Sequence, residues 1–565
     1  MDFKVKYEDW CKNQYFDEAT KRELESIATN EEEMKDRFYR DLEFGTGGLR
    51  GIVGAGTNRM NIYTVRKATQ GLANFIIKEG KQSMGVAIAY DSRHFSPEFS
   101  EEAALCLNAN GIKTYRFESL RPTPELSFAL RKLGCCAGIV VTASHNPPEY
   151  NGYKVYWEDG AQVTAPKDVQ IIEEVNNVTD YAMVKTMTRA GAEQKDLYHT
   201  IGKEIDDAYM QELHNLVLSK EAIKSVASDL TIVYTPLYGT GNLPVRRILS
   251  ELGFEKVYVV KEQELPDGNF PTVSYPNPED KNAFKLALAL AKEVNADLIL
   301  ATDPDADRLG VYARNNDTGE YEAFTGNMSG LLICEYELER KKELGILPEN
   351  GAIISTIVTT NMAFAVAKEY GMKLIEVLTG FKYIGEQIKL FEETGSNEYV
   401  FGLEESYGCL IGTHARDKDA IVAVMALCEA AAYYKTKGIT LWDQMLRIYE
   451  KYGYYKETLM TITLKGMDGA NQIKQMMDDM RQHPMTEAGG MKVLKMRDYL
   501  KPEETKLPES NVLYFELEDD AWFCVRPSGT EPKIKFYFGV KGTSMEDAKQ
   551  KAERLEADVR REVEK

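Results

Sequence analysis

Three apolar segments of this chain have the character of buried strands, and each runs directly into a short polar motif. The pairs of segment and motif residue are 137–142 with Ser144, 296–301 with Asp303, and 398–401 with Glu404. In open α/β sheets, ligand sites form beyond the carboxyl ends of the strands. The pattern therefore predicts a structural repeat of three α/β units whose strand ends face one shared cleft.

Strand-like runs alternate with helical patterns along most of the chain, which favours an α/β architecture with buried sheets. From about residue 455 the runs look like an antiparallel set that ends in a charged helix over 544–564, and 483–510 has the proline and charge content of a loop or insertion. We expect three similar mixed-sheet α/β domains and a smaller carboxy-terminal α+β domain around a central cleft. The expected ranges are 1–205, 206–318, 319–450 and 451–565.

The motif at Asp303 contains three aspartates at alternate positions, Asp303, Asp305 and Asp307. Alternate residues of an extended segment point the same way. Two carboxylates about 4 Å apart repel by roughly 4 kcal/mol at an effective dielectric near 20, so three of them need a cation or shifted pKa values. Oxygen-only ligands suit Mg²⁺.

Three other interpretations of the aspartate motif are weaker or remain open. A calcium loop needs Gly at its sixth position and Glu at its twelfth, where this chain has Arg308 and Arg314. A solvated acidic turn does not explain the apolar segment that leads into it. A phosphatase-type aspartyl nucleophile at Asp303 favours Thr or Val where this chain has Asp307.

Ser144 is the candidate nucleophile, since it stands between an apolar run and Asn146-Pro147-Pro148. It lacks the Gly-x-Ser-x-Gly elbow of acyl hydrolases. Its direct neighbour His145 is expected to have poor geometry for a base in a turn. A hydroxyl that faces a cation site suits phosphoryl transfer, in which positioning and charge neutralisation supply most of the catalysis.

Residues 526–533 combine cations, hydroxyls and a glycine, which together suit an anion. An ordinary hairpin loop is the alternative. The chain has no Gly-x-x-x-x-Gly-Lys-Ser/Thr loop, which argues against a P-loop ATPase. Residues 45–51 nearly match a dinucleotide loop but lack its third glycine spacing, so we interpret them as a flexible turn that presents Arg50.

Two further polar segments are candidates for sugar or phosphate contacts. Glu404 and Ser406 could hydrogen-bond to sugar hydroxyls, although such a segment is more often a capped turn. Residues 414–419 contain His414, Arg416 and Lys418, which could hold a phosphate or form a solvated face.

The charge balance and the cysteines restrict the partners and the compartment. Lys and Arg number 69 against 89 Asp and Glu, a net charge of −20, which disfavours nucleic acid and anionic membranes as partners. No stretch approaches the ~20 apolar residues of a membrane span. Eight cysteines without Cys-x-x-Cys spacing predict reduced thiols and a cytoplasmic location.

These segments, in this order, resemble those of the α-D-phosphohexomutases over nearly the whole chain. The resemblance implies that Ser144 is the phosphoserine and that Mg²⁺ is held by it and by Asp303, Asp305 and Asp307. It further implies a catalytic group of Ser144, Lys154, Arg50 and His145. The residues implied in substrate binding are Glu404, Ser406, Lys418, Arg308, Arg526, Ser528, Gly529, Thr530 and Lys533.

The resemblance also implies the activity. The glycine-rich segment 45–51 and the long amino-terminal extension are closest to the phosphoglucomutase-2-like branch. The implied reaction interconverts α-D-glucose 1-phosphate and glucose 6-phosphate through a bisphosphate intermediate, with glucose 1,6-bisphosphate as activator. Phosphopentomutase and glucose-1,6-bisphosphate synthase activities on the same scaffold are alternatives, as are a phosphatase and a sugar-phosphate-binding protein. Whether the protein is a monomer or a dimer is left open.

Overall fold

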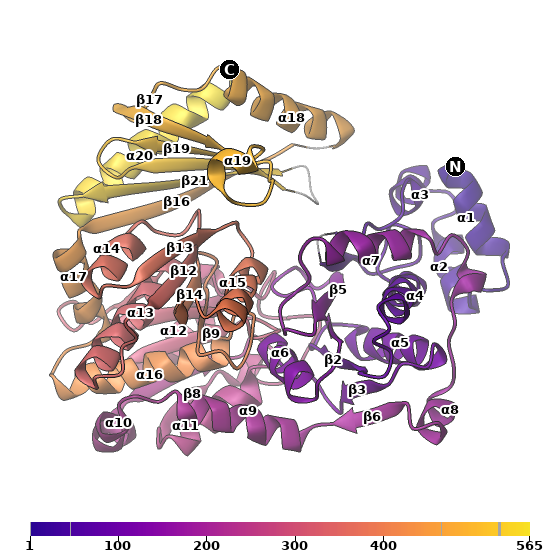
Figure 1. Cartoon of the computed structure of the whole chain (residues 1–565), viewed down its shortest axis with the longest axis horizontal. Helices are drawn as coiled ribbons and strands as arrows, with labels where there is room; N and C mark the ends of the chain where they lie inside the picture. Colours follow the sequence, from indigo (N-terminus) through magenta and orange to yellow (C-terminus); the bar gives the residue numbers. More distant parts are fainter. Residues whose placement is uncertain (1, 46, 465, 529–532, 565) are drawn as a thin grey trace.

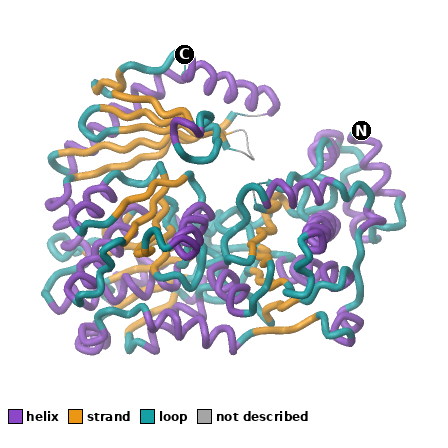
Figure 2. Tube along the Cα trace, viewed as in Figure 1, coloured by secondary structure: helices purple, strands orange, loops and turns teal. Residues whose placement is uncertain are grey.

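Four β-sheets follow one another along the chain (Figure 1). The structure is a computed structural model that describes residues 2–45, 47–464, 466–528 and 533–564. Helices are layered on the strands of the first three sheets, and the last sheet stands above the third (Figure 2). Within the described residues, no helix has the length and apolar character needed to cross a membrane.

The first sheet has the strand order β1-β5-β4-β2-β3-β6 and is mostly parallel, and β5 runs antiparallel to both of its neighbours, β4 and β1. Its strands are β1 (Gly48–Ile52), β2 (Val86–Tyr90), β3 (Thr114–Phe117), β4 (Ala137–Val141), β5 (Tyr150–Trp157) and β6 (Tyr198–Ile201). The helices of this part are α1 (Phe3–Lys12), α2 (Glu18–Ser26), α3 (Glu31–Phe38), α4 (Ile62–Lys78), α5 (Ser96–Ala109), α6 (Thr123–Lys132), α7 (Lys167–Asn176) and α8 (Arg189–Gln194).

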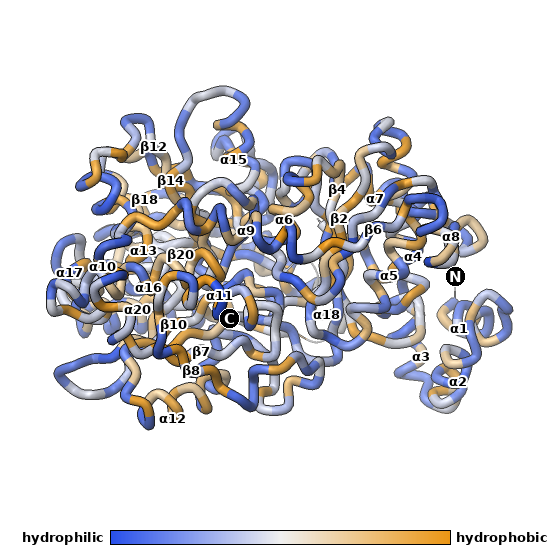
Figure 3. The backbone as a smooth tube through the Cα atoms, turned by 90° about the horizontal axis from the view of Figure 1, so that it is seen from below, coloured by the Kyte–Doolittle hydropathy of each residue, from blue (hydrophilic) through white to orange (hydrophobic). Residues whose placement is uncertain are grey.

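The second sheet has the order β11-β10-β9-β7-β8. Its strands are β7 (Thr231–Thr235), β8 (Lys256–Val259), β9 (Leu298–Thr302), β10 (Leu309–Arg314) and β11 (Tyr321–Phe324), with helices α9 (Lys203–Asn215), α10 (Lys220–Val226), α11 (Asn242–Glu251) and α12 (Lys285–Val294). Much of α12 is coloured as hydrophobic in Figure 3, and its Ala287 and Ala291 are buried against this sheet.

The third sheet has the order β13-β12-β14-β15. Its strands are β12 (Gly351–Thr356), β13 (Lys373–Val377), β14 (Glu398–Glu404) and β15 (Gly408–Ile411). The helices are α13 (Gly326–Glu343), α14 (Met362–Glu369), α15 (Phe381–Thr394), α16 (Ala420–Thr436) and α17 (Leu441–Tyr452).

One topological feature recurs in these three sheets and confirms the predicted repeat. A buried strand enters the sheet parallel to its neighbour, a polar motif follows, and the chain returns as an antiparallel strand. The three returning pairs are β4–β5, β9–β10 and β14–β15. The motifs that contain Ser144, Asp303 and Glu404 therefore occupy equivalent positions.

The fourth sheet is antiparallel, with the order β16-β21-β20-β19-β18-β17. Its strands are β16 (Tyr454–Thr463), β17 (Glu487–Ala488), β18 (Met491–Asp498), β19 (Leu513–Leu517), β20 (Trp522–Pro527) and β21 (Lys533–Gly542), with helices α18 (Gly466–Gln482), α19 (Pro502–Thr505) and α20 (Met545–Val563). The interpretation of 483–510 as a loop or insertion is wrong, because β18 pairs with β19 inside the sheet. The exposed Lys492 and Lys495 interrupt the apolar pattern of β18 and conceal its strand character.

The hydrophobic cores show how these parts are joined. One continuous core begins at Ala87, runs through the first three sheets and reaches Tyr455 at the start of β16. The fourth sheet has its own core, which includes Phe515 and Phe523, and its opposite face packs on the third part through Trp522 and its neighbours. The domain ranges stay a prediction; the boundary expected at 318 and 319 falls between β10 and β11, which are paired strands.

Candidate active site

The loop after β4 places Ser144 at the contact between the first and second sheets. The Ser144 backbone has φ of 51°, a left-handed conformation that non-glycine residues seldom adopt. Its N–H donates to Thr142 Oγ1 over 2.8 Å, and its side-chain Oγ donates to Asp303 Oδ2 over 2.7 Å. A strained backbone conformation persists only where the surrounding contacts hold it in place, and such residues are frequent at functional sites.

His145 lies closer to the serine hydroxyl than its position in sequence suggests. Its Nδ1 is 3.1 Å from Ser144 Oγ, so the expected poor geometry for a base is wrong. The left-handed turn rotates the two neighbouring side chains toward each other. Burial and the charges of Arg308 and Arg50 lower the pKa of His145 well below its usual range, so the ring is neutral.

The three aspartates converge as predicted. One carboxylate oxygen from each of Asp303, Asp305 and Asp307 lies within 4.8 Å of the others, and all three residues are buried. Asp303 Oδ1 accepts from the backbone N–H groups of Asp307 and Arg308 over 3.1 and 3.0 Å. The loop thus closes on its own first aspartate.

The charges of the triad are only partly compensated by protein groups. Burial and the charges of Asp305 and Asp307 raise the pKa of Asp303 well above its usual range. Asp305 Oδ1 and Asp307 Oδ1 are buried and have no hydrogen-bond partner. Because buried carboxylate oxygens need a partner, these two oxygens fit a bound cation.

Two basic residues approach the triad from neighbouring strands. Lys154 on β5 has its Nζ 2.9 Å from Asp305 Oδ2 and 3.9 Å from Asp307 Oδ2. Burial lowers the pKa of Lys154, but the charges of these two aspartates outweigh it and raise the pKa overall. Arg50 donates to Asn146 Oδ1 over 3.3 Å, beside the Ser144 loop.

The interpretation of residues 45–51 as a flexible turn is wrong for the part that bears Arg50. Gly48–Ile52 forms β1, which pairs with β5, and Arg50 lies opposite Gly152. A Cβ added at Gly48 would lie 1.9 Å from the Tyr153 carbonyl oxygen, so this close approach requires glycine.

The turn between β14 and β15 contains Glu404 and Ser406. Glu404 Oε1 accepts from the Gly380 N–H over 2.9 Å. After Ser406 the chain adopts a left-handed conformation at Tyr407, whose carbonyl accepts from the Leu309 N–H over 2.9 Å. The third motif is thereby attached to the strand that follows the aspartates.

Lys418 joins the second and third motifs. Its Nζ lies 3.2 Å from Asp307 Oδ2 and 3.8 Å from Glu404 Oε2. The Lys418 side chain passes over Gly408, where an added Cβ would lie 1.9 Å from its Cδ. Arg308, which follows the aspartates, forms an ion pair with Glu279.

The fourth motif approaches the third from the carboxy-terminal sheet. Arg526 lies near the end of β20 and Ser528 directly follows that strand, and the Ser528 N–H donates over 2.7 Å to the carbonyl of Lys533 at the start of β21. Burial and Glu404 raise the pKa of Glu405 to about 7, and Arg526 is near enough to oppose that rise. Gly529 and Thr530 lie outside the described residues.

Sequence reasoning missed several groups around this site. Lys535 on β21 lies near Arg526, whose charge together with burial lowers the pKa of Lys535. Thr123 donates to Asp305 Oδ2 over 3.0 Å, and Arg93 donates to the carbonyl of Ser144 over 2.6 Å. Alternation along the strand would have indicated Lys535, which faces the same side as Lys533. Thr123 and Arg93 have no such signal, because their partners are distant in sequence.

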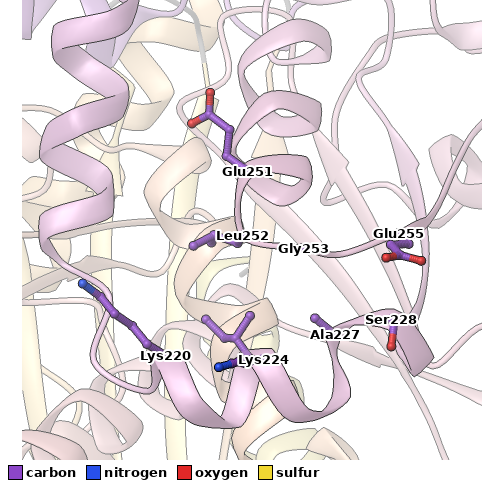
Figure 4. A pocket seen from close by; sticks show the side chains of 9 residues that line it. Lys220, Lys224, Ala227, Ser228, Glu251, Leu252, Gly253 and Glu255 are labelled. Atoms are coloured by element: carbon purple, nitrogen blue, oxygen red, sulfur yellow. The ribbon is translucent and has the colours of Figure 1, made fainter.

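A separate hollow lies on the outside of the second part, between α10 and the end of α11 (Figure 4). It has a volume of about 410 Å³ and is lined by residues that include Lys220, Lys224 and Glu251. It contains none of the predicted site residues.

The geometry combines a hydroxyl aimed at a buried carboxylate cluster with flanking basic residues and a separate cationic loop. Metal-assisted phosphoryl-transfer enzymes need this combination. Comparison with known families agrees with this class. The models for phosphoglucomutase/phosphomannomutase alpha/beta/alpha domains I, II and III match residues 41–182, 207–318 and 325–452, and the C-terminal domain model matches 484–557.

Individual relatives agree with the family models. The chain is 36% identical over 532 residues to a phosphoglucomutase from Staphylococcus aureus strain MRSA252, covering 92% of this chain and 93% of that protein. Two solved structures share the fold. A phosphoglucomutase/phosphomannomutase family protein from Burkholderia thailandensis has a TM-score of 0.67 at 20% identity, covering 92% of this chain and 96% of its own. Parafusin from Paramecium, in an open form, has a TM-score of 0.69 at 19% identity, covering 93% and 95%.

The chain therefore belongs to the phosphoglucomutase/phosphomannomutase family.

Proposed function

We propose that the protein reversibly interconverts α-D-glucose 1-phosphate and glucose 6-phosphate, with Ser144 carrying the transferred phosphoryl group. The observation that carries the proposal is the 2.7 Å hydrogen bond from Ser144 Oγ to Asp303 Oδ2, at the edge of the buried triad. The 36% identity to a curated phosphoglucomutase over most of the chain supports the same reaction.

Asp303, Asp305 and Asp307 would hold Mg²⁺ together with the phosphorylated Ser144. Their ligand atoms are all oxygens, which this ion prefers. When bound, such an ion supplies charge neutralisation for the phosphoryl oxygens and for the leaving serine oxygen. Asp305 Oδ1 and Asp307 Oδ1 support this assignment, because both are buried and neither accepts a hydrogen bond.

Different side chains around the reacting oxygen would accept its proton and supply positive charge. The neutral His145 ring and the Asp303 carboxylate both contact Ser144 Oγ and can accept its proton. The pKa of Lys154 is raised, so this residue is an ammonium in the structure and suits the phosphoryl oxygens. Arg50, near Asn146, adds a second positive charge on the same side.

Substrate recognition would come from the other two motifs. Glu404 at the end of β14 and Ser406 in the turn that follows can bind sugar hydroxyls, with Lys418 3.8 Å from the Glu404 carboxylate and Arg308 near enough for the charge of Glu404 to raise its pKa. Arg526, Ser528 and Lys533 would hold the phosphate that is not being transferred, with Gly529 and Thr530 completing that loop. Either end of the bisphosphate must fit there, because one loop serves both substrate orientations.

Glucose 1,6-bisphosphate would act as activator by returning a phosphoryl group to an unphosphorylated Ser144. The partners would be small sugar phosphates rather than nucleic acid or membranes. All eight cysteines are free thiols, which supports the proposed cytoplasmic location.

The deciding experiment ranks a panel of sugar 1-phosphates by kcat/KM. The panel contains glucose, mannose, ribose and deoxyribose 1-phosphates, and each is assayed with and without 1,3-bisphosphoglycerate. The proposal expects the highest value for glucose 1-phosphate, with isomer formation exceeding phosphate release. A higher kcat/KM for a pentose 1-phosphate would indicate a phosphopentomutase instead. Product formation that consumes 1,3-bisphosphoglycerate stoichiometrically would indicate a glucose-1,6-bisphosphate synthase.

A further inference from the structure

Arg93 lies beneath the Ser144 loop and binds much of its backbone. The residue is 1% exposed, at the connection between β2 and α5. Its guanidinium donates to the carbonyl oxygens of Ser144, Asn146, Pro147 and Tyr150, with distances of 2.6, 2.8 and 3.0 Å to the first, third and fourth. One planar side chain thus holds the loop at four points.

A second set of contacts fixes the same loop from its other end. Asp91 Oδ2 is 3.4 Å from Arg93 Nε and accepts from Thr142 Oγ1 over 2.6 Å. Thr142 Oγ1 in turn accepts from the Ser144 N–H. The strained left-handed backbone of Ser144 is therefore held at its N–H and at its carbonyl by one buried network.

The network is covered by a residue from the second domain. The Phe270 ring lies over the Arg93 guanidinium, 5.0 Å from carbon to centroid, and is 1% exposed. Phe270 itself has φ of 47°, a conformation that is costly for an aromatic residue. Ser144 and Phe270 are thus two strained residues of one network, which indicates that the position of the Phe270 ring matters there.

The segment that carries Phe270 meets the first domain at close range. Asn269 Oδ1 is 2.9 Å from His94 Nε2. A Cβ at Gly268 would lie 2.7 Å from the His94 backbone nitrogen, so only glycine allows this approach. The proline-rich residues 265–278, which have no part in the proposed chemistry, thus form a strap over the first domain.

The strap also leads back to the aspartate loop. Tyr238 packs on Phe270, with ring centroids 6.0 Å apart, and its hydroxyl donates to Thr272 Oγ1 over 2.8 Å. Two residues further on, the Thr240 N–H donates to the carbonyl of Pro304, between the first two aspartates. A continuous set of contacts joins the aspartate loop to the serine loop through Phe270 and Arg93.

We propose that Arg93 and Phe270 are positioning residues that hold the Ser144 hydroxyl in register with the aspartate triad across the boundary between two domains. Neither residue touches the reacting atoms, so their effect is on the geometry of the transfer and not on sugar binding. Only the expected effect on kcat rests on the proposed phosphoryl transfer. The expected effect on the position of the Ser144 loop does not.

The test compares Phe270→Leu with Phe254→Leu, which removes a buried phenyl ring from the same domain at a site away from the strap. Arg93→Lys is measured in parallel, since lysine cannot reproduce the planar fork. Each variant is characterised by kcat and KM for glucose 1-phosphate, by Tm, and by amide hydrogen exchange of residues 143–150.

Phe270→Leu is expected to lower kcat by about tenfold with KM nearly unchanged, because small displacements of a reacting group are costly. Exchange of residues 143–150 should become faster. Arg93→Lys should do the same to a larger extent, whereas Phe254→Leu should lower Tm without either effect.

Exchange of residues 143–150 that is equal in Phe270→Leu and Phe254→Leu would overturn the inference. An equal kcat in these two variants would do the same. If Phe270→Leu is not recovered folded, Arg93→Lys against Phe254→Leu decides by the same criteria. If the wild-type protein transfers no phosphoryl group between sugar positions, the proposed function fails, and the exchange measurement still decides on the strap.

Discussion

Ser144 is the residue on which the proposed reaction depends. Ser144→Ala removes the oxygen that would carry the phosphoryl group, so turnover is expected to fall by about three orders of magnitude or more. The fold should be retained, because the loop is held mainly through backbone groups. Sugar-phosphate assays and transfer of label from phosphorylated substrate to the protein measure the effect.

Ser225→Ala is the control for this variant, since Ser225 is exposed on α10 and its hydroxyl donates to the Ala222 carbonyl of the same helix. It should retain wild-type turnover and labelling. Label that persists in Ser144→Ala would mean that another group accepts the phosphoryl group, and the assignment would be wrong.

Asp305 is the residue that tests the cation site. Asp305→Asn removes one of three buried carboxylate charges while keeping the shape of the side chain. We expect the Mg²⁺ concentration for half-maximal activity to rise and kcat to fall by about a hundredfold, because the ion neutralises charge in the transition state. The pKa of Lys154 should also fall, since the charge of Asp305 is the largest contribution that raises it.

Metal titration of activity, followed at fixed substrate, checks this prediction. Asp297→Asn serves as the control, because Asp297 directly precedes β9 at the end opposite the triad and pairs with Lys435. A titration curve of Asp305→Asn that coincides with the wild-type curve would remove Asp305 from the cation site.

The residues of the site differ in whether a local sequence pattern marks them. The aspartates alternate within five residues, and Ser144 follows an apolar strand, so local pattern was sufficient to find them. Arg93 and Phe270 act through partners in other segments, and nothing in their immediate neighbours marks them. His145 was misjudged for a related reason, because the left-handed turn at Ser144 cannot be read from residue types.

At the level of strands and helices, local pattern predicted most of the architecture. The strand expected over 137–142 and the helix expected over 544–564 correspond to β4 and α20 almost residue for residue. β18 was missed because its solvent-facing lysines and the surrounding prolines outweigh its few apolar residues. Its strand state comes from pairing with β19, a tertiary contact that local propensity does not contain.

Helix α16 contains a buried carboxyl that makes stability depend on pH. Glu429 accepts from the Leu218 N–H over 2.7 Å and from the Ser219 N–H, and burial and the charge of Glu337 raise its pKa to about 7. A raised folded-state pKa stabilises the protein fully below the unfolded value near 4.5. That contribution is lost as the pH rises through about 7.

Glu429→Gln removes this titration while keeping an oxygen for both N–H groups. The variant should gain stability relative to wild type between pH 5 and pH 8, by at most roughly 3 kcal/mol for a shift of this size. Tm at the two pH values measures the gain. Glu221→Gln, exposed on the neighbouring α10, controls for the loss of a negative charge. A Tm difference from wild type that is the same at pH 5 and pH 8 would contradict the prediction.

On the scale of the whole molecule, the first three parts share one core, which reaches Tyr455 on β16, while most of the fourth sheet packs on a core of its own. The motifs with Ser144, Asp303 and Glu404 therefore lie on parts that share this core, whereas Arg526, which we propose binds phosphate, lies on the fourth sheet. The contact between them includes a smaller cluster in which Trp522 and Tyr514 pack against aliphatic residues such as Ile357, together with an ion pair from Arg497 to Glu376. Such an interface permits the hinge motion by which an enzyme encloses a bisphosphate.

Separate cores predict separate unfolding. Phe515 is buried in the fourth core, stacked on Phe523 at 4.2 Å, whereas Phe401 is buried in the shared core. Truncating either to alanine costs about 3–5 kcal/mol in a packed core. Calorimetry should resolve two transitions, with Phe515→Ala lowering one and Phe401→Ala lowering the other. The two variants are matched in residue type and burial, so each serves as the control for the other.

If both variants shift a single common transition, the four parts unfold as one unit and the fourth part is not free to move alone. The proposed phosphate loop would then have to close on the substrate without a rotation of its domain.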